Sequence, residues 1–145
     1  MISLPEDAIA AIERHGGESY RDEACGVLYG HVRGDAKEIV RAAPLPNARD
    51  DERHRRFIVT ADDYRRAEGE AHRSGLTLLG FYHSHPDHPA YPSEYDREHA
   101  FPFFSYVILS VAKGVPGEMR SFVLSEDRSE FREEDLKLKE SATCR

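Results

Sequence analysis

The sequence predicts an α/β or α+β protein in which a strand-rich sheet is layered with at least two helices. Short apolar runs bounded by glycine, proline and charged residues are typical of strands, and two intervening stretches repeat apolar residues at helical spacing. Because each amphipathic helix must bury one face against a sheet, this order favours a layered architecture. With 145 residues the chain can bury a substantial core, and we expect a single domain over residues 1–145.

The N-terminal region predicts a short strand followed by a helix. Residues 1–4 are mostly apolar, and Pro5 suits the first turn of a helix because its missing N–H needs no partner there. Alanines and isoleucines then recur on one helical face. Gly16 and Gly17 are expected to end this helix.

A second helix is predicted after Thr60. Its hydroxyl is a typical N-cap, and Asp63 three residues later completes a capping-box pattern. Ala67 and Ala71 belong to the inner face of the helix, which Gly75 is expected to close.

The remaining apolar runs predict the sheet. Residues 76–85 form a nearly continuous apolar run, which indicates a central strand buried on both faces. Residues 31–35 predict a turn, residues 44–56 an exposed loop and residues 93–100 a short helix. Further strands are predicted at residues 24–29, 37–42, 57–59, 106–111, 119–124 and 131–138.

Composition excludes several classes of protein. The net charge of −7 argues against a protein that binds the nucleic-acid backbone, and the basic residues 53–56 lie beside acidic ones. No run approaches 18 apolar residues and no secretory signal is apparent, so we expect neither membrane insertion nor export. Cys25 and Cys144 form no disulfide framework, which favours the cytoplasm. No pattern fixes an oligomeric state.

Four residues form the most informative pattern, H-x-H-x7-S-x2-D at His83, His85, Ser93 and Asp96. Side chains two residues apart on a strand share one face, roughly 6.5–7 Å apart at Cα, so one divalent ion can contact both imidazoles. Asp96 can supply a carboxylate from the next loop or helix. Two histidines and a carboxylate, with a fourth position left to water, are typical of a catalytic zinc site.

Each of these residues also has an ordinary structural interpretation. Histidines on a strand are often simply half-exposed, and Ser93 with Asp96 matches the start of a helix. The cap and the metal site are compatible, because a capped helix can point Asp96 back at the ion. The complete string should occur by chance in about one in several thousand chains of this size.

With this motif the sequence resembles the JAMM (MPN+) zinc metalloproteases, in particular the small stand-alone prokaryotic members. The stretches E-A-C-G-V-L-Y-G at residues 23–30, Pro46-Asn47 and G-F-Y-H-S-H-P at residues 80–86 add to the resemblance. The resemblance implies a single-domain α/β/α mixed sheet of cytidine-deaminase-like fold. It also implies hydrolysis of amide or isopeptide bonds.

The resemblance assigns a role to each motif position. It implies that His83, His85 and Asp96 bind one Zn²⁺ together with a water molecule, and that Glu23 is the general base. It implies that the Ser93 hydroxyl donates to the oxyanion of the tetrahedral intermediate. These roles are chemically coherent, since an unbound carboxylate can accept a proton and a hydroxyl donates without adding charge.

Some assignments stay open on the sequence alone. Asp22 could serve as the base as well as Glu23, and only the family pattern selects Glu23. Cys25 is most simply a small core residue, although its thiol could be sensitive to oxidation. His88 is either a residue of the catalytic cleft or a solvated loop residue.

The expected substrate is a ubiquitin-like or sulfur-carrier protein with a flexible C-terminal Gly-Gly tail, which lies along a sheet edge and enters the zinc cleft. The loops at residues 44–56 and after Asp96 are short, which argues against an enzyme specific for polyubiquitin linkages. A non-catalytic MPN scaffold is the alternative outside enzymes. A nucleobase deaminase is disfavoured because the chain has no C-x-x-C segment. We expect the acidic residues 126–140 to form a charged edge strand, with partner binding as the alternative.

Overall fold

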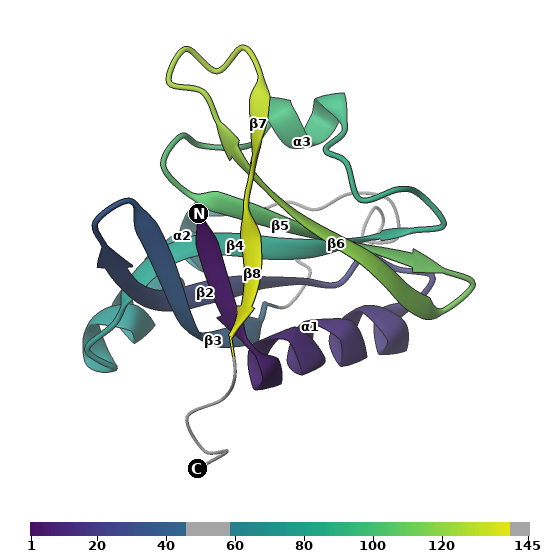
Figure 1. Ribbon diagram of the computed structural model, residues 1–145, viewed down its shortest axis with the longest axis horizontal. Helices are drawn as coiled ribbons and strands as arrows, with labels where there is room; N and C mark the ends of the chain where they lie inside the picture. Colours follow the sequence, from purple (N-terminus) through teal and green to yellow (C-terminus); the bar gives the residue numbers. More distant parts are fainter. Residues whose placement is uncertain (46–58, 140–145) are drawn as a thin grey trace.

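The computed structural model describes residues 1–45 and 59–139, which form a mixed sheet with helices on both faces (Figure 1). The strand order is β7-β6-β5-β4-β2-β3-β1-β8. In chain order the elements are β1 (Ile2–Pro5), α1 (Glu6–Ser19), β2 (Cys25–Arg33), β3 (Ala36–Pro44), α2 (Ala61–Arg73), β4 (Thr77–Pro86), α3 (Glu94–Glu98), β5 (Ser105–Ala112), β6 (Val115–Leu124), β7 (Phe131–Glu134) and β8 (Leu136–Lys139).

Two cores separate the layers of the fold. One contains Ala67 and Ala71 of α2 packed with Phe81 of β4, and the other contains Ile12 of α1 packed with Leu79 of β4. Along β4, Leu78 and Phe81 lie in the first core and Leu79 and Tyr82 lie in the second, which confirms that this strand is buried on both faces. The predicted helix–sheet–helix layering is therefore confirmed.

The helix α1 differs from its prediction at its C-terminal end. Gly16 and Gly17 do not end it, because the helix continues to Ser19. A Cβ added at Gly16 would lie only 2.8 Å from Leu109 Cδ2 of β5. The glycine therefore allows the helix backbone to approach the sheet closely, and this packing role replaces the predicted stop signal.

The helix α2 begins and ends as predicted. Thr60 Oγ1 accepts from the Asp63 N–H and Asp63 Oδ2 accepts from the Thr60 N–H, both at 3.1 Å. After the last helical residue, Gly75 adopts a positive φ of 69°, a conformation that favours glycine. The predicted loop over residues 44–56 and strand over residues 57–59 fall largely outside the described residues.

The two C-terminal strands occupy opposite ends of the strand order although only Asp135 separates them. β7 pairs with β6 in antiparallel fashion, and β8 pairs with β1 in parallel fashion. In Figure 1 they follow one another as a single long yellow ribbon. The acidic residues 126–140 were expected to form a charged edge strand, and they contribute the strands at both edges of the sheet. The predicted turn at residues 31–35 is shorter than expected, since β2 continues to Arg33.

Among the described residues, no helix combines the length and the apolar character needed to cross a bilayer.

Candidate metal centre

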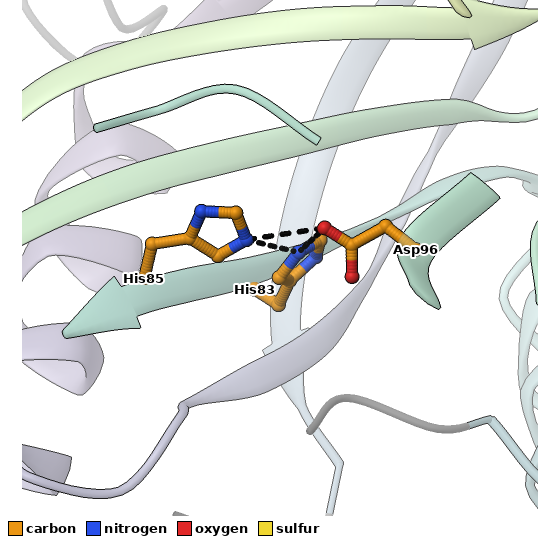
Figure 2. A group of neighbouring side chains, drawn as sticks. All are labelled: His83, His85 and Asp96. Atoms are coloured by element: carbon orange, nitrogen blue, oxygen red, sulfur yellow. Dashed lines mark hydrogen bonds and ion pairs between the residues drawn. The ribbon is translucent and has the colours of Figure 1, made fainter. Parts of the chain in front are cut away.

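The two motif histidines lie on one face of β4. His83 and His85 flank Ser84, so both imidazoles point to the same side of the strand, and both are buried. Figure 2 shows them meeting a carboxylate that reaches in from α3. β4 is paired on both sides here, with Cys25 of β2 and Ile108 of β5 opposite His83. The sheet therefore fixes the backbone that carries the two imidazoles.

Asp96 is positioned by the capping box that starts α3. Ser93 Oγ accepts a hydrogen bond from the Asp96 N–H at 3.0 Å, and the Ser93 N–H donates to Asp96 Oδ2 at 2.9 Å. The same Oδ2 lies 3.3 Å from His83 Nε2 and 3.1 Å from His85 Nε2. The helix start predicted at Ser93 is confirmed, and it directs Asp96 at the histidines.

These three side chains form a group able to hold a divalent cation. The two Nε2 atoms are 3.2 Å apart, and the ligand atoms of His83, His85 and Asp96 all lie within 4.8 Å of one another. Tetrahedral zinc with ligands at about 2.0–2.2 Å separates neighbouring donor atoms by about 3.3–3.6 Å, close to the observed spacing. Burial opposes ionisation of Asp96, but the two histidines hold the pKa of its carboxyl well below its usual range. The carboxylate is therefore available as an anionic ligand.

The orientation of His85 is set by a backbone carbonyl. Its Nδ1 lies 3.0 Å from the Pro89 carbonyl oxygen, which can only accept, so Nδ1 carries a proton and Nε2 faces the cluster. Burial lowers the pKa of His85, but the hydrogen bond and charge of Asp96, the Pro89 carbonyl and the charge of Glu23 outweigh it and raise that pKa overall. Such an orienting contact is typical of metal-binding histidines.

Glu23 and Ser93 line a hollow of about 530 Å³ next to the cluster, together with His85 and His88. Glu23 lies two residues before β2 begins at Cys25, and its charge helps to raise the pKa of His85. Of the two carboxylates that the sequence left open, Glu23 rather than Asp22 lines this hollow. The fold thus brings the upstream glutamate to the same place as the histidine motif.

Ser84 connects the two distant parts of this site. The Ala24 N–H donates to Ser84 Oγ at 2.8 Å, and the Ser84 N–H donates to the Ala24 carbonyl at 3.0 Å, across 60 residues of sequence. Ser84 is buried on the face of β4 opposite the histidines. The sequence analysis did not single it out. Its position between two alternating histidines was the available signal, because it must face the other side of the strand.

The structure bears on both residues whose roles the sequence left open, Cys25 and His88. Cys25 is buried, and burial raises the pKa of its thiol to about 12, so the thiol is protonated at neutral pH and is a poor nucleophile. His88 is an exposed loop residue that nevertheless lines the hollow beside Glu23.

A second, apolar cavity of about 480 Å³ adjoins the cluster on the side of His83 and Asp96. The sequence analysis missed it because its aromatic residues are spread along the chain and only the fold gathers them. They are Tyr64, Phe81, Phe101, Phe104, Tyr106 and Phe131.

Two curated relatives have peptidase-type names. Over 114 residues the chain is 33% identical to the desampylase of Haloferax volcanii, covering 75% of this chain and 80% of that protein. Over 130 residues it is 33% identical to the CysO-cysteine peptidase of Mycobacterium tuberculosis, covering 84% of this chain and 82% of that protein.

Solved structures show the same fold. A protein of Desulfitobacterium hafniense matches with a TM-score of 0.85 and 32% identity, over 97% of this chain and 94% of that one. A JAB1/MPN domain protein from Archaeoglobus fulgidus matches with a TM-score of 0.56 and 19% identity, over 94% of this chain and 96% of that one. The likeness to the second protein confirms the predicted JAMM/MPN fold.

Residues 5–125 match the Prok-JAB family, described as prokaryotic homologs of the JAB domain. This match spans every position of the histidine motif and the upstream glutamate. The chain therefore belongs to the prokaryotic JAB-domain family, to which its motif pointed.

Proposed function

We propose that the protein is a zinc-dependent peptidase that hydrolyses the amide bond after the C-terminal Gly-Gly tail of a ubiquitin-like or sulfur-carrier protein. The observation that carries this proposal is the convergence of His83, His85 and Asp96 beside a hollow lined by Glu23 and Ser93. The peptidase names of two relatives support the reaction class.

In the proposed site, His83 Nε2, His85 Nε2 and Asp96 Oδ2 would hold the zinc ion. When bound, zinc supplies Lewis acidity, which polarises the scissile carbonyl and lowers the pKa of water from 15.7 towards about 7. Burial of the histidines and the hydrogen bond from His85 to Pro89 keep these ligands in place.

Glu23 acts as the general base and then as the general acid. Its carboxylate takes the proton from the attacking water and returns it to the leaving nitrogen. The hollow that it shares with His85 gives a substrate access to both groups.

Ser93 stabilises the oxyanion. Its Oγ accepts the Asp96 N–H, so its own hydroxyl hydrogen remains to donate to the substrate. That Ser93 is exposed and also lines the hollow supports this role.

An extended tail suits this site, but the histidine strand cannot receive it as an added strand. Over residues 80–83, β4 is paired with β2 on one side and with β5 on the other, so the backbone donors and acceptors there are occupied. The tail must therefore reach the cluster from beyond the end of β4 or along another strand. Glycines at the scissile bond let the tail backbone approach the buried ligands closely.

The proposal is tested with carrier fusions that place a reporter after a Gly-Gly tail. We expect about one zinc per chain by mass spectrometry, and cleavage directly after Gly-Gly that a chelator abolishes and added zinc restores. Fusions with the tail changed to Ala-Pro serve as the control. Zinc binding without cleavage of any carrier would instead favour a non-catalytic scaffold.

Replacing Ser84 with Ala is expected to lower kcat on the order of ten- to a hundredfold without changing zinc content, because Ala24 loses its side-chain acceptor and Glu23 is held less accurately. The measurements are kcat, KM and bound zinc. Ser121→Ala is the matched control, since Ser121 is equally buried but donates to Glu134 at 2.7 Å. Wild-type kcat in Ser84→Ala would contradict this positioning role.

A further inference from the structure

The apolar cavity beside the metal cluster has no part in the proposed chemistry, yet it shares two residues with the cluster. His83 and Asp96 lie in its lining, while the hollow on the other side is lined by His85, Ser93 and Glu23. The two spaces therefore flank the three ligands. A polypeptide that crosses the cluster enters from one space and leaves through the other.

Packed aromatic rings form the walls of the cavity. The Phe104 ring lies 5.4 Å from that of Phe81 and 5.8 Å from that of Tyr64, in edge-to-face contacts. Tyr106 stacks on Phe81 at 5.8 Å, and its hydroxyl accepts from the Phe101 N–H at 2.9 Å. Rings that hold one another in this way form a space of fixed shape suited to a large apolar side chain.

Three polar side chains in the lining already have partners. Thr60 is bonded within the capping box of α2, and His99 Nδ1 donates to the Tyr95 carbonyl at 2.9 Å. Arg65 is exposed at the cavity and forms an ion pair with Asp62. A charged or polar side chain placed against the aromatic walls would therefore lose water without gaining a partner there, which disfavours it.

The position of Glu23 gives the direction of the substrate. A group that protonates the leaving nitrogen must lie on the leaving side of the scissile bond. Because Glu23 lines the hollow on the His85 side, the leaving group occupies that hollow. The acyl portion of the substrate then extends to the other side, past His83 and Asp96, into the apolar cavity.

We propose that this cavity is a specificity site for a large aliphatic or aromatic side chain on the acyl side of the scissile bond, at the third or fourth residue counted back from it. This inference rests on the proposed peptidase function, in which the first two residues are glycines. Two extended residues span about 7 Å, enough to carry the next side chain from the cluster into the adjoining cavity.

Binding of the acyl product tests the inference without turnover. Labelled peptides that end in X-Gly-Gly with a free carboxylate are titrated by fluorescence anisotropy against the zinc-loaded Glu23→Gln protein. We expect Leu or Phe at X, or one residue earlier, to bind on the order of ten- to a hundredfold more tightly than Asp or Gly. Equal affinities for Leu, Phe and Asp would overturn the inference.

Variants of the cavity give an independent check. Ala61→Trp fills the cavity from the first turn of α2, and we expect it to remove the preference for Leu and Phe over Gly. Arg66→Trp is the matched control, because Arg66 lies on the same helix, is 72% exposed and is not in the cavity lining. If Ala61→Trp folds poorly, Phe101→Ala replaces it, since Phe101 is 52% exposed and its loss should weaken the preference without removing core packing.

The outcomes separate this inference from the proposed function. Cleavage of Gly-Gly fusions at one rate for Leu, Phe and Asp would overturn the specificity site and leave the peptidase standing. A preference confined to the residue after the scissile bond would overturn the acyl-side assignment. An apolar preference in binding, with no fusion cleaved, would support the site and contradict the hydrolytic function.

Discussion

Replacing Glu23 with Gln is expected to lower kcat for cleavage of a Gly-Gly carrier fusion by about 10²–10⁴-fold, while zinc stays bound at the wild-type ratio. The amide keeps the size of the side chain but can neither take the proton from water nor return it to the leaving nitrogen. The measurements are kcat with the fusion substrate and zinc content by mass spectrometry on the same preparation.

Asp22→Asn is the matched control for this change. It removes the same charge one residue away, from a side chain that does not line the hollow beside His85. We expect it to retain nearly full activity. Strong loss of activity in Asp22→Asn with full activity in Glu23→Gln would reverse the assignment of the base.

Replacing Asp96 with Asn is expected to remove most of the bound zinc and, with it, the activity. The variant loses the carboxylate whose Oδ2 lies 3.3 Å from His83 Nε2 and 3.1 Å from His85 Nε2. The helix cap should survive, because an asparagine oxygen can still accept the Ser93 N–H. Loss of zinc would therefore reflect the ligand and not the folding of α3.

A second capping box in the same chain provides the control. Asp63 plays the same capping part in α2 with Thr60 and is not one of the three candidate metal ligands, so Asp63→Asn tests the cost of the substitution alone. Zinc that binds only the folded state stabilises it by about 2.7 kcal/mol at a hundredfold excess over Kd. We expect zinc to raise the melting temperature of wild type and Asp63→Asn but not of Asp96→Asn. An equal rise in all three proteins would show that Asp96 does not bind the metal.

The predictions from local sequence succeeded where a short-range interaction decides the structure. The capping boxes at Thr60 and Ser93 involve partners three residues apart, and both are present. The prediction failed at Gly16, because a glycine can end a helix or allow a close contact. The contact with Leu109 of β5, 93 positions later in the sequence, decided between them.

The candidate site divides in the same way. The spacing of His83, His85 and Asp96 on a strand and a following helix predicted their convergence, because strand alternation and the helix cap are local geometry. Glu23 could be linked to them only through the family pattern. Its place at the site depends on the pairing of β2 with β4, which the Ala24–Ser84 hydrogen bonds extend.

The sequence by itself determined the convergence of the three candidate metal ligands and the elements that carry them, since those depend on side-chain periodicity and on hydrogen bonds within a few residues. Only the tertiary structure decided what surrounds the ligands. The choice of Glu23 over Asp22 beside His85 and the gathering of aromatic rings next to His83 both come from strand order and register. Contacts of this kind join segments that are far apart in the chain, so no local pattern records them.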